Sequence, residues 1–241
     1  GYSDGIGLAA QFVSLQGITY DNSGNLYVVD RYRIRKIIVS TAQVITIAGQ
    51  TTRGFVDGTG TSAQFYNPFG ITYDGTGNLY VTDQHAIRKI ILSTNEVVTV
   101  AGSGLTPGST DSTGLSARFN FPKGITWDGS GNLYVTDQGN YTIRKIVVSN
   151  FQVSTIAGTV GVAGATDGTG TSATFNGSIG IIHYNGTLYT VDSLSGTIRK
   201  INLSTLEVTT LVGSVANYGN LIDGTGSSAG MINPYYLTID S

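Results

Sequence analysis

Short runs of apolar and alternating residues recur along the chain, and glycine, asparagine, aspartate or serine bounds each run. In residues 70–102 the runs read "GITYD", "NLYVTD", "AIRKI" and "VVTVAG". They are rich in Ile, Val, Thr and Tyr, which strands favour. "DGTGN" joins the first two runs and "ILSTNE" the last two, as hairpin turns do. No run keeps a 3.6-residue period over ten residues or more, so the pattern predicts strands without helices.

The four-strand pattern itself repeats along the 241 residues. First strands start at Gly17, Gly70, Gly124, Gly180 and, for a fifth copy, Tyr236, at spacings of 53, 54, 56 and 56 residues. The predicted units are 17–69, 70–123, 124–179, 180–235 and a partial 236–241. A four-stranded meander cannot bury both faces alone, so radial stacking into a β-propeller is the predicted all-β fold. The alternative is an open β-solenoid, whose turns are shorter than these units.

A glycine-rich motif precedes each unit. "DGTGTSAQF" at 57–65 looks like a phosphate-binding loop, but related segments begin at residues 4, 111, 167 and 223. A nucleotide loop occurs once, so a motif seen five times is interpreted as architecture. We expect its aspartates to accept hydrogen bonds from amides of their own linker, with calcium binding as the alternative, and its aromatic residues to lie buried between blades. These residues are Asp57, Asp111, Asp167 and Asp223, and Phe65, Phe119 and Phe175.

Two segments of the third unit resemble a known repeat family. "GNLYVTDQGNYTIRKI" at 131–146, followed by "VSTIAG" at 153–158, looks like an NHL repeat, and the resemblance covers essentially the whole chain. It is closest to the bacterial exported type, whose linkers read "AG…DGTG.AA.F..P.G". The resemblance implies a propeller that in closed members usually has six blades. Members include protein and RNA binders, a metal-dependent lyase and many extracellular proteins.

Composition and charge exclude several classes of protein. The net charge is −2, so no basic field favours nucleic acid, and without cysteine there is no disulfide framework. No apolar run approaches 18 residues, so no membrane span is predicted. A chain that begins with Gly1 is expected to be a processed form or a piece of a longer protein. Scarce lysine and abundant threonine and tyrosine favour an extracellular or cell-surface location.

The charged residues occupy repeating positions. Every acidic residue falls at an equivalent place in two or more units, whereas catalysis needs an acid and a base in different environments. Eight of the 13 basic residues lie in the "IRKI" strands, where Arg88 is expected to pair with Asp83 across its hairpin. His85 and His183 lie 98 residues apart and cannot form a histidine cluster. We therefore predict no catalytic residue, no metal and no cofactor.

The loops that follow the second strand of each unit vary most, together with the linkers. The meander places both on one face of the disc, the loop face, and variable loops on a rigid scaffold often form binding surfaces. Arg53, Arg118 and Lys123 fall on the same face. Solvent exposure without a partner is the alternative. The candidate contact residues are Arg31, Tyr32, Arg33, Gln84, His85, Gln138 and Tyr141.

The fifth first strand is surplus to a ring of four blades. It is expected to begin a further blade of a longer array, to fill the first blade of another copy in a head-to-tail filament, or to pack outside a closed ring. Leu237 and Ile239 are expected to be buried by residues outside the four units. The predicted function is a non-enzymatic structural or binding module with protein partners or self-association. The alternative is a metal-assisted hydrolase or lyase on the loop face.

Overall fold

Four antiparallel sheets follow one another along the chain in a computed structural model that describes residues 1–240. Each is the predicted meander, and the hairpin turns fall where glycine and asparagine were expected. In the first hairpin turn of the second unit, Asp74 Oδ1 accepts hydrogen bonds from the Thr76 amide at 2.8 Å and the Asn78 amide at 3.0 Å. The first two blades comprise β2 (Leu15–Tyr20), β3 (Asn25–Asp30), β4 (Arg33–Ile38) and β5 (Gln43–Gly49), then β7 (Pro68–Tyr73), β8 (Asn78–Asp83), β9 (Ala86–Ile91) and β10 (Glu96–Gly102). The last two comprise β11 (Pro122–Trp127), β12 (Asn132–Asp137), β13 (Thr142–Val147) and β14 (Gln152–Ala157), then β16 (Ser178–Tyr184), β17 (Thr187–Asp192), β18 (Thr197–Asn202) and β19 (Glu207–Val212).

The glycine-rich linkers add a short fifth strand to three of the four sheets. β6 (Gly58–Thr59) pairs with β10, the outermost strand of the blade that follows the linker. β1 (Gly5–Ile6) and β15 (Gly168–Thr169) pair in the same way with β5 and β19. In the third blade the equivalent contact is a single bridge between Thr113 and Gln152. Each linker therefore wraps the outer edge of its own blade before the chain enters the first strand.

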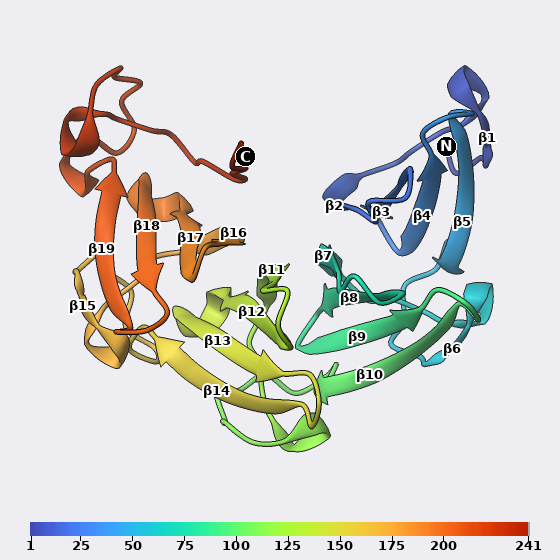
Figure 1. Cartoon of the computed structure of the whole chain (residues 1–241), viewed down its shortest axis with the longest axis horizontal. Helices are drawn as coiled ribbons and strands as arrows, with labels where there is room; N and C mark the ends of the chain where they lie inside the picture. Colours follow the sequence, from blue (N-terminus) through green and yellow to red (C-terminus); the bar gives the residue numbers. More distant parts are fainter. Residues whose placement is uncertain (241) are drawn as a thin grey trace.

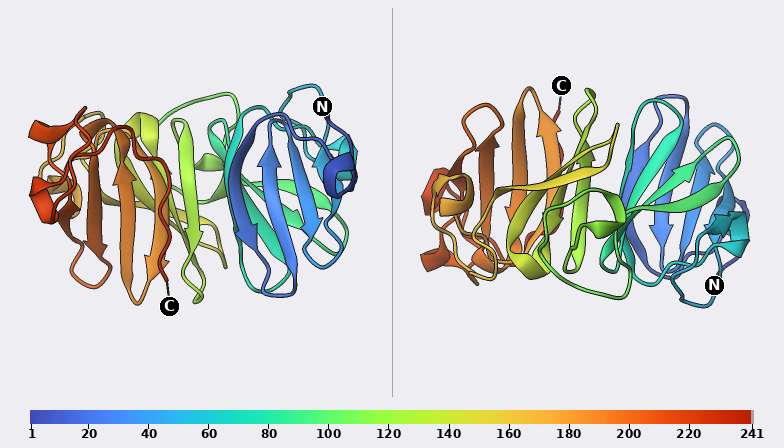
Figure 2. Two further views of the ribbon diagram at one scale, coloured as in Figure 1. Left: turned by 90° about the horizontal axis from the view of Figure 1, so that it is seen from above. Right: turned by 90° about the horizontal axis from the view of Figure 1, so that it is seen from below.

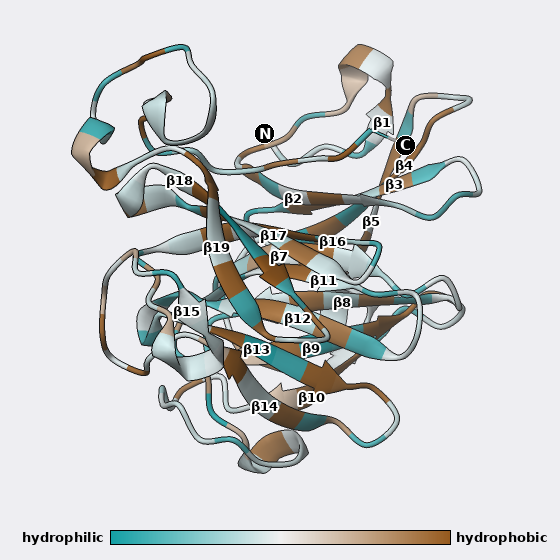
Figure 3. Cartoon of the chain, turned by 60° about the vertical axis from the view of Figure 1, so that its left-hand side comes forward, coloured by the Kyte–Doolittle hydropathy of each residue, from teal (hydrophilic) through white to brown (hydrophobic). Residues whose placement is uncertain are grey.

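The blades stand side by side in an arc whose inner edge is formed by β2, β7, β11 and β16 (Figure 1). Viewed from the edge, the strands run between two faces that carry the turns (Figure 2). Apolar residues concentrate on the strands (Figure 3). Three buried clusters join consecutive blades. In the first cluster, Val29 and Ile34 of the first blade pack with Leu79 and Val81 of the second.

The two ends of the arc expose apolar side chains that are buried at equivalent places elsewhere. Ile18 of β2 is 58% exposed, whereas Ile71, Ile125 and Ile181 are 5–6% exposed. Leu211 of β19 is 46% exposed, whereas the equivalent Ile156 is 8% exposed. The structure is thus a propeller arc with two open apolar faces, which were not apparent from the repeat alone.

Residues near the C-terminus occupy the position of a further first strand. A Cβ placed on Gly124 would lie 2.2 Å from the Ile179 carbonyl oxygen of the next blade, which is why the inner strands need glycine here. A Cβ on Gly180 would meet the Tyr235 carbonyl oxygen at 2.6 Å in the same way. The segment therefore lies along β16 as β16 lies along β11. Leu237 and Ile239 are half-buried there, and their burial from outside the four units remains a prediction.

Candidate functional site

Each blade contains a buried arginine held between two aspartates, an arrangement called here the clasp. In the second blade, Arg88 Nη1 lies 3.0 Å from Asp83 Oδ2, and Nη2 lies 2.8 Å from Asp57 Oδ1. The guanidinium also stacks over the Phe65 ring, 5.1 Å from its centroid. The predicted pairing of Asp83 with Arg88 is therefore confirmed. Both side chains are fully buried, so the pair lies in the core of the blade.

The same clasp recurs in the other three blades. Arg144 bridges Asp137 at 2.7 Å and Asp111 at 2.6 Å. Burial raises the pKa of Asp83 and of Asp137 to about 6, against the opposing effect of the neighbouring arginines. The remaining clasps are Asp30–Arg35–Asp4 and Asp192–Arg199–Asp167.

The expected role of the linker aspartates is wrong in one respect. Asp57 does not accept from amides of its own linker: Oδ2 accepts from the Thr99 amide at 3.0 Å, and Oδ1 from the Thr99 hydroxyl at 2.9 Å. The reason is that the linker pairs with β10, so the carboxylate faces that strand and not its own turn. Asp111 likewise accepts from the Thr155 amide at 2.9 Å and the Thr155 hydroxyl at 3.1 Å, and Asp167 Oδ1 accepts from the Thr210 hydroxyl at 2.9 Å.

Asp223 is the exception among the linker aspartates. It is exposed and has no ion pair or side-chain hydrogen bond with residues 1–240, which contain no third and fourth strands beyond β19 to supply an arginine and a threonine. The aromatic half of the motif agrees with expectation: Phe65, Phe119 and Phe175 are fully buried against the clasps. Met231 stands in the equivalent fifth position, where its Cε would lie 3.0 Å from a Cβ on Gly213.

The candidate contact residues of the first blade come together in one cluster. The Arg31 guanidinium donates to the Tyr2 hydroxyl at 3.1 Å and lies over the Tyr32 ring at 5.0 Å. Arg33 donates to the Tyr2 carbonyl at 3.0 Å and stacks on the Tyr2 ring at 4.5 Å. Tyr2 was missed because it lies 29 residues from Arg31, outside any repeated motif.

The candidates of the next two blades lie apart from that cluster. His85 is 4% exposed, and its Nδ1 accepts from the Phe121 amide at 3.2 Å, so it joins the second blade to the third. Burial lowers the pKa of His85. Gln84, Gln138 and Tyr141 are half-buried in their loops. Of the residues considered, His85 presents the least side chain to a partner.

A second cluster lies at the loop-face end of the inner strands. Pro68 pairs with Asp83, and Pro122 with Asp137, so Phe69 and Lys123, one residue further on, lie near the second-strand ends. Lys123 Nζ is 4.3 Å from the Phe69 ring centroid, and the Tyr236 ring stacks on Phe69 with centroids 6.3 Å apart. The signal in the sequence is the residue before each "GIT" motif, which differs in every unit: Gln16, Phe69, Lys123, Ile179 and Tyr235.

Within residues 1–240, no three His, Asp or Glu side chains are grouped closely enough to hold a metal ion. No helix in that part of the chain is long and apolar enough to cross a membrane.

The arrangement of four-stranded antiparallel blades around an inner arc of first strands defines a β-propeller. Solved structures agree at the level of the fold. An auxiliary nutrient binding protein from Bacteroides ovatus matches with a TM-score of 0.62 at 17% identity, covering 94% of this chain and 64% of the other. The Nidogen/Laminin complex matches with a TM-score of 0.60 at 17% identity, covering 84% and 65%. A virginiamycin B lyase from Staphylococcus aureus gives 0.52 at 16% identity, covering 97% and 76%.

Sequence relatives narrow the class further. NHL repeat-containing protein 2 is 36% identical over 107 residues in Homo sapiens and 31% identical over 160 residues in Bos taurus, covering 43% and 61% of this chain. Protein SUPPRESSOR OF QUENCHING 1, chloroplastic, from Arabidopsis thaliana is 32% identical over 114 residues, which is 44% of this chain and 11% of that protein. No family model matches. The repeats of this chain are thus similar to those of NHL repeat-containing proteins, and the chain spans 15% and 22% of the human and bovine relatives.

Proposed function

We propose that this chain is a non-enzymatic protein-binding module that acts outside the cell or on its surface. The observation that carries the proposal is the clasp. Eight of the 15 acidic residues are tied to four buried arginines in repeating pairs and serve the fold, which supports a non-enzymatic role because acid–base catalysis needs free carboxylates in different environments. The likeness to the Nidogen/Laminin complex and to nutrient-binding propellers supports a binding role and, more weakly, an extracellular one.

The proposed contact surface is the loop face. Arg31, Tyr32 and Tyr2 form a joined aromatic and cationic cluster there, and arginine and tyrosine are enriched in interface hot spots. A photo-crosslinking residue at Tyr32 should capture a protein partner, whereas the same residue at Thr76, in a turn of the opposite face, should not. Capture at Thr76 alone would move the surface to the other face.

Self-association through the open ends of the arc is the finer part of the proposal. Ile18 at one end and Leu211 at the other are exposed only at those ends, and a head-to-tail contact would bury both. Light scattering over a concentration series should show association that Ile18→Asp or Leu211→Asp abolishes. Leu194→Asp is the control, because Leu194 is 52% exposed in a loop. A monomer at every concentration would contradict this part alone.

The enzyme alternative rests on the lyase that shares the fold at 16% identity. Metal analysis of the purified protein separates the two functions. A stoichiometric ion bound on the loop face or in the channel between the inner strands would favour the metal-assisted hydrolase or lyase and count against the binding module.

A further inference from the structure

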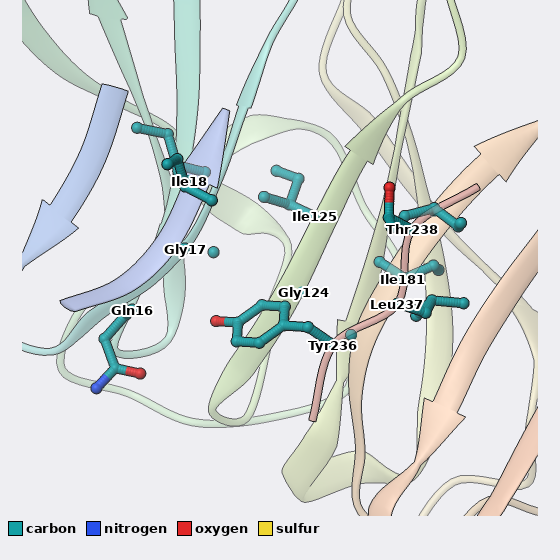
Figure 4. A pocket seen from close by; sticks show the side chains of 13 residues that line it. Gln16, Gly17, Ile18, Gly124, Ile125, Ile181, Tyr236, Leu237 and Thr238 are labelled. Carbon is teal, nitrogen blue, oxygen red and sulfur yellow. The ribbon is translucent and has the colours of Figure 1, made fainter. Parts of the chain in front are cut away.

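A cavity of about 480 Å³ runs along the inner edge of the arc. Its wall combines the glycine backbones of the four inner strands with Ile18, Ile71, Ile125 and Ile181, and Tyr236 closes one side (Figure 4). No acidic residue lines the cavity in the described part of the chain. An apolar body of small-molecule size therefore fits its chemistry.

Tyr236 breaks the symmetry of this wall. It occupies the place of Gly17, Gly70, Gly124 and Gly180, so a ring enters space that the other repeats leave free. One face of the ring stacks on Phe69 at an interplanar angle of 14°, and the residue is still 51% exposed. An aromatic ring held in this way offers its open surface to a second aromatic group.

Lys123 is the one charged residue among the five equivalent positions that precede the first-strand motifs. The equivalent residues are neutral, namely Gln16, Phe69, Ile179 and Tyr235. Its ammonium lies over the Phe69 ring and forms no ion pair or hydrogen bond with the side chains and backbone of residues 1–240. Burial lowers its pKa, as expected for a cation that lacks an anionic partner. By contrast, the guanidinium of Arg118 donates to the carbonyls of Leu115 and Ala117, both at 2.7 Å.

We propose that a small aromatic monoanion binds at the loop-face mouth of this cavity, beside Lys123, which does not itself line the cavity but directly precedes the lining residue Gly124. The anionic group would pair with the Lys123 ammonium, the aromatic ring would stack on Tyr236, and the rest of the molecule would lie among the isoleucines. A carboxylate or sulfonate supplies the anionic partner that the Lys123 ammonium lacks. In these partly desolvated surroundings an ion pair is stronger than in water. This inference concerns a small molecule and is independent of the protein-binding function.

The test uses two probes with the same aromatic body. 1-Anilinonaphthalene-8-sulfonate carries one negative charge, and N-phenyl-1-naphthylamine carries none. Lys123→Met retains the apolar stem and should weaken binding of the sulfonate about tenfold, or roughly 1.4 kcal/mol, with little effect on the neutral amine. Lys123→Arg should preserve sulfonate binding, and Lys89→Met on β9 is the matched control. Tyr236→Gly should weaken both probes.

The open apolar ends of the arc can also bind such dyes, but these ends are the same in every variant. Differences in dye affinity between variants therefore measure binding at the mouth of the cavity. Far-ultraviolet circular dichroism and thermal unfolding verify that each variant is folded. Equal sulfonate binding by Lys123→Met and wild type would overturn the proposal. So would equal losses for the charged and neutral probes, which would show that Lys123 acts through packing alone.

Discussion

Alanine substitutions at three aspartates, namely Asp83, Asp57 and Asp223, measure how much each part of the clasp contributes to the free energy of unfolding. Asp83 is fully buried, and its removal leaves the Arg88 cation in the core with one half-exposed partner. Breaking a buried ion pair in this way costs about 3–5 kcal/mol of unfolding free energy. Asp83→Ala also removes the acceptor of two hydrogen bonds, which the Tyr66 and Asn67 amides donate to the carboxylate at 2.9 and 2.7 Å. We therefore expect Asp83→Ala to be the most destabilising of the three.

Asp57→Ala is expected to cost less. The Asp57 side chain is 48% exposed and accepts from Arg88 and from two groups of Thr99. Charge-assisted hydrogen bonds contribute about 1.5–3 kcal/mol when buried, and solvent screening reduces that here to about 1–2 kcal/mol in total. Asp223→Ala is the matched control, because it has the same motif position without the partners. Its effect should stay within about 0.5 kcal/mol.

Urea unfolding followed by tyrosine and tryptophan fluorescence gives the three free energies, and hydrogen exchange at the Thr99 amide reports the local effect. Asp57→Ala should lower protection at Thr99, whereas Asp223→Ala should not. The reasoning is refuted if Asp223→Ala destabilises as much as Asp57→Ala, or if Asp83→Ala costs less than Asp57→Ala.

Three other substitutions test the packing and the blade contacts. Phe119→Ala should lower the unfolding free energy by about 3 kcal/mol, because it opens a cavity under the Arg144 guanidinium, and calorimetry showing no loss would contradict that role. Gly70→Ala should destabilise by about 1–3 kcal/mol, because the new Cβ would meet the Lys123 carbonyl oxygen at 2.3 Å; an unchanged melting temperature would exclude that contact. Because burial lowers the pKa of His85 below its unfolded value near 6.5, protonation favours the unfolded state, and stability should fall as the pH drops through 6.5, by at most about 1.4 kcal/mol per pH unit. Denaturant titrations at pH 8 and pH 5.5 give the loss of unfolding free energy between the two pH values, and this loss should be smaller in His85→Gln than in wild type. An equal loss in both proteins would show that the protonation of His85 is not linked to unfolding.

Much of the fold follows from local residue patterns. Strand composition, hairpin glycines and the repeat spacing predict four meanders, because each depends on neighbours within a few residues. The partner of Asp57 could not be predicted in the same way. Its glycine-rich surroundings suit an Asx turn, and the competing threonine lies 42 residues further along the chain. Only the pairing of β6 with β10 decides between the two.

The candidate site also contains residues that the local pattern predicts and residues that it does not. Position in the meander predicts which loops share a face, so Arg31 and Tyr141 could be placed there from the sequence. Burial of His85 against Phe121 could not, because it depends on the packing of one blade on the next. Lys123 was recognisable as a basic residue outside the repeat, but its environment depends on Phe69 and Tyr236, which come from different units.

The wrapping of each linker around its own blade has a consequence for synthesis on the ribosome. The Asp57 carboxylate emerges 42 residues before the Thr99 that it binds and 31 before Arg88. During that interval Phe65 has only the preceding blade to pack against. We therefore expect each nascent blade to pack first on its finished neighbour. Its clasp and linker contacts form only when its last strand leaves the exit tunnel. The arc then grows from its N-terminal end in steps of one repeat.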